Sequence, residues 1–223
     1  MGSSYIAHRS QSIIKIQLKG LLVPLSKESQ TRMPAIFTPN RNVSCPQSLP
    51  SSNYQTALLR GEVLLETKAH TAWGAAVMAQ MYVPRPRPHV WQQLTDYPRW
   101  QQYFIDITQS HLLSTENPHP ADAVIEKRLY QAASKSFLFL HIQVKAYLRV
   151  VETLERRIQF RLESGSFQDF AADLRLRTHG EGTLLTYYVQ ATPLIPIPSM
   201  VIQQAIHLDL PANMRKMRQV ICA

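Results

Sequence analysis

The strongest constraint on this chain is a two-residue alternation of apolar and polar side chains that recurs across residues 104–192. Successive side chains of a β-strand point to opposite faces, so the alternation predicts strands with one buried face and one solvated face. It is clearest over residues 137–151, where every second position from Leu138 to Val150 is apolar. Gly165 and Gly180 supply turns between the later strands. Short turns between successive strands predict an antiparallel meander.

Further strand and helix signals precede this meander. Residues 75–83 have the pattern of a strand that ends at a group of prolines beginning with Pro84. A short helix is expected next, because Val90, Trp91 and Leu94 share one helical face. Another helical turn is predicted over residues 99–103.

A long C-terminal helix is predicted from Ser199, a residue type that is favoured at helix N-caps. Its apolar stripe has spacings of three and four residues. The stripe consists of Ile202, Ile206, Leu210, Met214, Met217 and Ile221. Pro211 lies inside the stripe and predicts a kink near Leu208, since proline has no N–H to donate and its ring clashes with the preceding turn.

Residues 1–60 differ in composition from the rest of the chain. They carry seven Lys or Arg residues and one acid, Glu28, so they hold most of the net charge of +9. They are also rich in Ser, Gln, Asn and Pro, so we expect a disordered basic extension followed by one folded domain over residues 62–223. The alternative is an organellar transit peptide, since basic, Ser-rich and acid-poor segments are typical of that class. The expected location is cytoplasmic, or the plastid if residues 1–60 are a transit peptide.

Several classes of protein are not expected. The folded segment is close to charge balance and has no RNA-binding signature, so it does not predict nucleic-acid binding. No stretch approaches the roughly 18 consecutive apolar residues of a membrane span. The eight histidines show no metal-ligand spacing, and no nucleophile elbow, phosphate loop or HExxH motif is present. We therefore expect neither a metal nor a cofactor.

Four short motifs stand in order along the folded segment. They are V-W-Q-Q-L-T-D-Y at 90–97, G-S-F-Q-D-F at 165–170, G-T-L-L-T-Y at 182–187 and L-D-L-P-A-N-M at 208–214. Together they resemble the polyketide cyclase/dehydrase (coenzyme Q-binding-like) branch of the START-like superfamily, in forms typical of cyanobacteria and plastids. The resemblance implies an α+β helix-grip fold, in which a curved antiparallel sheet wraps around a long C-terminal helix and two short helices follow the first strand. Ser166 departs from this pattern, since the family has Asp there.

A sheet that curves around a helix leaves a concavity, and a pocket in it would favour apolar ligands. The candidate lining residues come from the inner faces of the strands and from the helix stripe. They are Ile142, Val144, Leu148, Phe160, Leu174, Tyr187 and Val189 from the strands, and Ile202, Ile206, Leu210 and Met214 from the helix. The alternative is that these side chains fill an ordinary core. The family resemblance favours the cavity.

An aromatic cluster is expected beside the mouth of this pocket. Its members are Tyr97, Trp100, Tyr103 and Phe104. They would gate the cavity or contact a membrane, since Trp and Tyr suit the boundary between apolar and polar surroundings. The alternative is that such residues anchor the short helices to the sheet.

These patterns predict a monomeric carrier or accessory protein that binds an apolar small molecule, such as a quinone, an isoprenoid or another lipid, without catalysis. A polyketide-type cyclase or dehydratase is the first alternative, but it needs an acid–base pair inside the cavity. No inward carboxylate stands among the apolar strand positions named above. The second alternative is a membrane-associated assembly factor, in which the basic extension and the aromatic cluster contact anionic lipid.

Overall fold

A computed structural model of the chain describes residues 52–68, 70–116, 124–137 and 140–223. Eight strands of this described part form one antiparallel sheet with the order β1-β2-β8-β7-β6-β5-β4-β3. The strands are β1 (Leu64–Lys68), β2 (Ala75–Val83), β3 (Ile107–Glu116), β4 (Val124–Phe137), β5 (Leu140–Thr153), β6 (Arg157–Gly165), β7 (Phe167–His179) and β8 (Gly182–Pro193). The helical segments are α1 (Ser52–Leu59), α2 (Arg87–Thr95), the 3₁₀ turn η1 (Tyr97–Arg99), α3 (Trp100–Tyr103), α4 (Ser199–Gln204), the π-helical segment η2 (Ala205–Asp209) and α5 (Leu210–Cys222).

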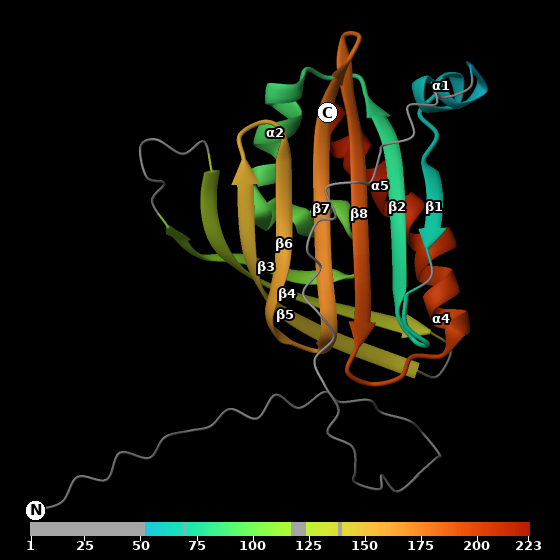
Figure 1. The fold of residues 1–223 in the computed structure, drawn as a ribbon, viewed down its shortest axis with the longest axis vertical. Coiled ribbons are helices and arrows are strands. Elements are labelled where there is room, and N and C mark those ends of the chain that lie inside the picture. Colours follow the sequence, from blue (N-terminus) through green and yellow to red (C-terminus); the bar gives the residue numbers. More distant parts are fainter. Residues whose placement is uncertain (1–51, 69, 117–123, 138–139) are drawn as a thin grey trace, which may run out of the picture.

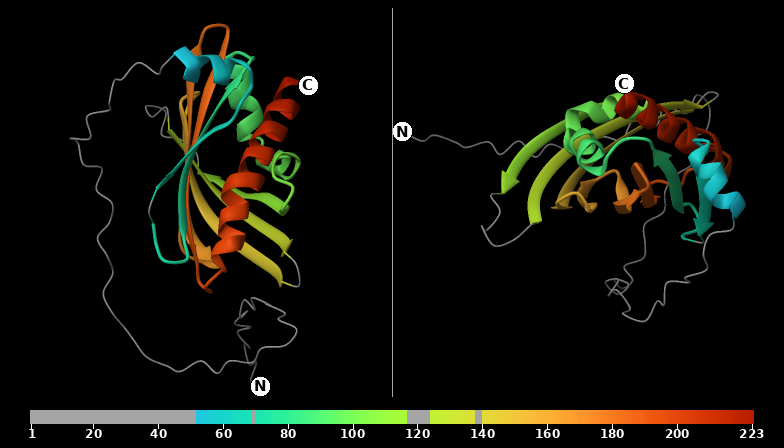
Figure 2. Two further views of the ribbon diagram at one scale, coloured as in Figure 1. Left: turned by 90° about the vertical axis from the view of Figure 1, so that its right-hand side faces the viewer. Right: turned by 90° about the horizontal axis from the view of Figure 1, so that it is seen from above.

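The predicted antiparallel meander is confirmed from β3 to β8, where each strand pairs with the next one along the chain. Strand β2 has the predicted bounds and pairs with β8. The sheet is strongly curved, and the C-terminal helix and the short helices lie on the same face of it (Figures 1 and 2). The prediction of a curved antiparallel sheet with a C-terminal helix against it is therefore confirmed.

The strand predicted over residues 137–151 is wrong at its start. Phe137 is the last residue of β4, and it pairs with Leu140 at the beginning of β5. Leu138, which was expected on the inner face, lies outside the described residues. From Ala146 onward the predicted face is correct, since Ala146, Leu148 and Val150 are all buried.

Helix α1 lies inside the segment that was expected to be disordered. Ala57 and Leu58 are buried in it, and the Tyr54 hydroxyl donates a hydrogen bond to the Gln80 side chain on β2. The expectation of disorder is therefore wrong for Ser52–Leu59. It stays a prediction for residues 1–51, which lie outside the described residues.

The C-terminal helix is interrupted where Pro211 predicts an irregularity. Proline at position 211 cannot donate to the preceding turn, and the chain adopts the π-helical segment η2 immediately before α5. After this segment the apolar stripe packs on the sheet, with Leu210, Met214, Met217 and Ile221 all buried. The predicted N-cap is shifted, because α4 begins at Ser199 itself and the residue before it is Pro198.

The turn between β6 and β7 depends on Gly165 and Ser166. The Ser166 N–H donates to the Lys145 carbonyl oxygen at 2.8 Å, and the Ser166 hydroxyl accepts from the Lys145 N–H at 3.0 Å. The serine side chain thus accepts a hydrogen bond from the backbone of β5, at the position where the motif resemblance implies Asp. Gly165 has φ +146°, and a Cβ there would stand 2.2 Å from the Lys145 carbonyl oxygen.

Replacing Gly165 by Ala is therefore expected to lower the free energy of unfolding by at least about 3 kcal/mol, because both the backbone angle and the clash oppose a side chain. Gly180 is a matched control, with φ +55° and no atom within 4 Å of an added Cβ. Gly180→Ala should lower the free energy of unfolding only by the conformational strain that the new side chain introduces, about 1–2 kcal/mol. Urea denaturation of both variants checks the difference, and equal losses would contradict the steric argument.

Candidate functional site

The inner face of the sheet has two ends that are packed differently. At the packed end, where β5 ends and β6 begins, Val150, Ile158 and Leu174 are fully buried. At the open end β5 begins and β8 ends beside α4 (Figure 1). Val201 on α4 is buried there, but several other apolar residues are only half-buried. These half-buried residues are Ile142, Val144, Leu162, Phe170, Val189 and, on α4, Ile202. The interior is therefore closed at one end and incompletely covered at the other.

The predicted lining residues divide between these two environments. Seven are buried in the core, namely Leu148, Phe160, Leu174, Tyr187, Ile206, Leu210 and Met214. Val189 and Ile202 are half-buried against that core. Ile142 and Val144 are half-buried on the inner face of β5, near its start. The structure thus brings most of the predicted set together under the helix, and their role as ligand contacts stays a prediction.

The four aromatic residues that were predicted beside the cavity mouth lie in the core or pack against it. Tyr97, Trp100 and Tyr103 are at most 3% exposed. The Trp100 ring lies 5.1 Å from the Phe160 ring between centroids, and half-buried Phe104 stacks on Trp100 at 5.6 Å. Burial of these three side chains does not suit a membrane contact, and a place for the cluster beside a cavity mouth stays a prediction. The three residues anchor the short helices to the inner face of the sheet.

The packed end contains a buried carboxylate that was not among the predicted site residues. Glu152 is 2% exposed on the inner face of β5. It accepts a hydrogen bond from the Tyr97 hydroxyl, and Lys127 Nζ lies 2.7 Å from its Oε1. Burial, and then the negative charge of Glu152, raise the pKa of the Tyr97 hydroxyl, which keeps it a donor. The signal was present, because position 152 continues the inward alternation of Leu148 and Val150.

A second ion-pair group stands beside the open end. Lys135, the cross-strand neighbour of Ile142, places Nζ 2.9 Å from Asp106 Oδ2 and 2.7 Å from Asp209 Oδ2. Burial opposes the charged form, but the hydrogen bonds to Asp209 and Asp106 outweigh it and raise the pKa of Lys135. The group ties β4 to the loop after α3 and to the end of η2.

Tyr187 lies between the packed end and the open end on β8. Its side chain is 7% exposed, and its ring meets the Phe104 ring edge-on at 6.3 Å between centroids. Burial raises the pKa of its hydroxyl well above the ordinary value. Two residues further along the same face, Val189 is only half-buried.

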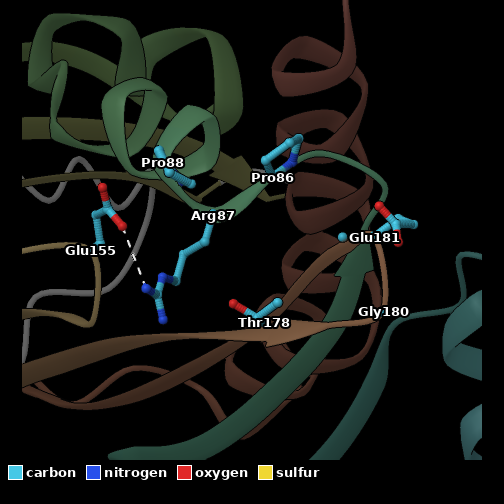
Figure 3. Close-up of a pocket in the computed structure, with 8 residues that line it drawn as sticks. Pro86, Arg87, Pro88, Glu155, Thr178, Gly180 and Glu181 are labelled. Atoms are coloured by element: carbon cyan, nitrogen blue, oxygen red, sulfur yellow. Dashed lines mark hydrogen bonds and ion pairs between the residues drawn. The ribbon is translucent and has the colours of Figure 1, made fainter.

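Two pockets in the described part of the chain lie outside this interior. One, of about 260 Å³, lies between the start of α2 and the β7–β8 turn, where Arg87 Nη2 is 3.5 Å from Glu155 Oε2 (Figure 3). The other, of about 370 Å³, lies on β4–β6 among charged residues that include the pairs Arg128–Glu163 and Arg149–Glu126. The lining of the second pocket is entirely charged, which does not suit an apolar ligand, whereas the first combines prolines and glycines with Arg87, Glu155 and Glu181.

The described residues contain neither a metal-holding group of side chains nor a membrane-spanning helix. No group of three or more His, Cys, Asp or Glu side chains there is placed to hold a metal ion. His141 is exposed and hydrogen-bonds with Ser136 Oγ at 2.9 Å. No helix in the same part of the chain is long and apolar enough to cross a bilayer.

Tyr97→Phe should lower the free energy of unfolding by about 1.5–3 kcal/mol, because it removes a buried hydrogen bond to a charged group. Tyr103→Phe is the matched control, since the Tyr103 hydroxyl donates to the neutral Gln93 carbonyl at 2.9 Å and its loss should be about 0.5–1.5 kcal/mol. Thermal and urea unfolding measure both. A smaller loss for Tyr97→Phe than for Tyr103→Phe would show that Glu152 does not depend on Tyr97.

Several solved structures share this fold at low sequence identity. A protein from Thermus thermophilus superimposes with a TM-score of 0.53 at 17% identity, over 66% of this chain and 96% of that one. A START superfamily protein from Mycobacterium smegmatis superimposes with a TM-score of 0.52 at 13% identity, over 72% of this chain and 97% of that one. A STAR-related lipid transfer protein from Xanthomonas axonopodis superimposes with a TM-score of 0.50 at 14% identity, over 71% of this chain and 99% of that one. At these identities the likeness shows the fold alone.

No curated protein sequence matches the chain. A family model described as polyketide cyclase / dehydrase and lipid transport matches residues 83–218, from the end of β2 almost to the end of α5. The match covers more than half of the chain and includes every motif on which the resemblance depended. The chain therefore belongs to the polyketide cyclase/dehydrase and lipid transport family.

Proposed function

We propose that this protein binds an apolar small molecule at the open end of its interior, as a carrier or accessory protein. The observation that carries the proposal is the group of half-buried apolar side chains there, which include Ile142 and Val144 from β5 and Ile202 from α4. Apolar surface left in contact with water is unfavourable by about 25 cal/mol for each Å². A ligand that covers about 200 Å² of it would therefore contribute about 5 kcal/mol. Membership of a family whose description includes lipid transport supports the same function.

The chemistry of these walls suits a quinone, an isoprenoid or another lipid. Aliphatic and aromatic side chains discriminate poorly among apolar molecules of similar size, so they define a class of ligand and not one compound. The coenzyme Q-binding-like branch suggested by the motifs makes a quinone the first compound to test.

We infer that a ligand enters this interior at the edge beside α4. The Lys135 group joins β4, the loop after α3 and the end of η2, where the α-helical hydrogen-bond pattern is already interrupted. π-Helical turns of this kind occur frequently at functional sites. A ligand that enters beside α4 would separate the Lys135 ion pairs and shift η2.

Catalysis by a cyclase or dehydratase ranks behind binding. The Tyr97–Glu152 pair supplies the inward carboxylate that such chemistry needs, but it lies at the packed end and Lys127 neutralises it. A carboxylate held in this way stabilises the fold and is not free to move a proton to or from a ligand at the open end. The membrane-associated alternative depends on residues 1–51, which lie outside the described residues, and on aromatic side chains of which three are buried.

Native mass spectrometry of the protein purified from its natural host, followed by solvent extraction, tests the proposal. We expect one bound apolar molecule for each chain. Val144→Trp, which fills the open end, should reduce its occupancy at least tenfold. The control Val151→Trp adds the same ring on the outer face of β5, where Val151 pairs with Glu126 and Gln159, and should retain the ligand. A wild-type protein that is empty and also ignores a panel of quinones, carotenoids and fatty acids would contradict the proposal.

A further inference from the structure

The surface pocket of about 260 Å³ lies at the packed end of the molecule, away from the open end (Figure 3). Three segments form it: the start of α2, the turn between β5 and β6, and the end of β7 with its turn into β8. The lining residues are Pro86, Arg87, Pro88, Glu155, Thr178, Gly180, Glu181 and Gly182. None of these residues belongs to the apolar core, so the pocket is separate from the apolar interior.

Arg87 presents a hydrogen-bond donor that the protein does not satisfy. Its Nε atom is buried and has no hydrogen-bond partner among the described residues. Its Nη2 atom lies 3.5 Å from Glu155 Oε2, which is longer than the usual hydrogen-bond length of about 2.9 Å. Buried donors in folded proteins are almost always paired, because an unpaired one has lost its interaction with water without replacement. The Nε–H group therefore points to an acceptor on a ligand of this pocket.

A carboxylate is the acceptor that suits Arg87 best. The guanidinium group keeps its positive charge, and its fork of N–H donors matches the two oxygens of a carboxylate. Arg87 is also the first residue of α2, whose first turn has no acidic side chain and no side-chain cap. The positive end of the helix dipole therefore adds to the attraction for an anionic group.

The other charged residues of the lining oppose a ligand that is only an anion. Glu155 and Glu181 line the same pocket, and Figure 3 shows them on either side of the Arg87 side chain. Glu155 is held there with φ +53°, a backbone conformation that residues other than glycine rarely adopt. The lining thus carries one positive and two negative side chains. A ligand that complements it needs a positive group beside its carboxylate.

We propose that this pocket binds a small zwitterion of the amino-acid type, whose carboxylate accepts hydrogen bonds from Nε and Nη2 of Arg87 and whose ammonium group pairs with Glu155. The rings of Pro86 and Pro88 would contact an apolar side chain of such a ligand. The volume lies just below the range of about 300–1,000 Å³ that is typical of sites for drug-sized ligands, so it suits a smaller molecule. The inference goes beyond the proposed function, because it concerns a second ligand of different chemistry.

Leucine and two analogues that each lack one charge test this assignment. 4-Methylpentanoate retains the carboxylate without the ammonium group, and 3-methylbutylamine retains the ammonium group without the carboxylate. Their affinities for the full-length protein are measured by titration calorimetry, and the Arg87 Nε–H signal is followed by ¹H–¹⁵N NMR. We expect leucine to shift this signal with a dissociation constant of about 1 mM or below. Each analogue should bind at least about tenfold more weakly, which is the size of one charge-assisted hydrogen bond.

Three variants locate the ligand. Arg87→Lys retains the charge but removes the Nε–H group, so it should weaken leucine binding at least about tenfold. Arg85→Lys is the matched control, because the Arg85 guanidinium already donates to the Cys222 carbonyl and does not line the pocket. It should retain the affinity. Glu155→Gln should weaken leucine binding and leave 4-methylpentanoate binding unchanged or tighter, since it removes the partner of the ammonium group alone.

Several results would overturn the inference. Leucine that does not bind the wild type would show that Arg87 Nε needs no such ligand. Equal affinities for leucine and 4-methylpentanoate would show that Glu155 and Glu181 do not select a positive group. Equal leucine affinities of Arg87→Lys and Arg85→Lys would place the ligand elsewhere. None of these results bears on the apolar ligand of the open end, which native mass spectrometry measures separately.

Discussion

The apolar inner face of a strongly curved sheet has to be covered, and one helix covers it unevenly. Strands β4 and β5 are 14 residues long, whereas the buried stripe of the C-terminal helix begins at Ile206 and is regular only from Leu210 onward. The helix therefore seals the end of the sheet where the short helices also pack. At the other end, α4 leaves inner-face side chains such as Ile142 and Val144 half-buried. The half-buried apolar face of the candidate site follows from this mismatch in length.

The polar groups of the interior follow the same division. At the packed end Glu152 is held by Tyr97 and Lys127, so a buried charge is stabilised by an opposite charge and a hydrogen bond. Beside the open end Lys135 pairs with Asp106 and Asp209, which belong to segments far apart in the chain. Tyr187 lies between these groups, with its side chain 7% exposed. Fixed polar pairs thus stabilise the packed end, while half-buried apolar side chains line the open end.

Much of this fold could be predicted from local patterns. The alternation indicated β2 with its observed bounds and the inner faces of β6 to β8, because each depends on one strand and its turn. The features that could not be predicted depend on contacts between distant segments of the chain. Helix α1 is short and is fixed by a contact with Gln80, and the partner of Glu152 is 55 residues away. Pro211 predicted an irregular helix, but a π-helical segment and its ion pair with β4 are properties of the packed molecule. The aromatic cluster was recognised, yet residue type alone does not tell a buried anchor from an exposed rim.

The central claim is that ligand binds beside α4 at the open end, and photoaffinity labelling tests its location most directly. A fatty acid with a diazirine on its acyl chain is irradiated with the full-length protein, and the labelled peptides are mapped by mass spectrometry. The account predicts labels on the start of β5, around Ile142 and Val144, and on α4 around Ile202, all removed by excess unlabelled lipid. Labels confined to exposed apolar residues elsewhere, such as Leu112 and Leu113 on the edge strand β3, would contradict it.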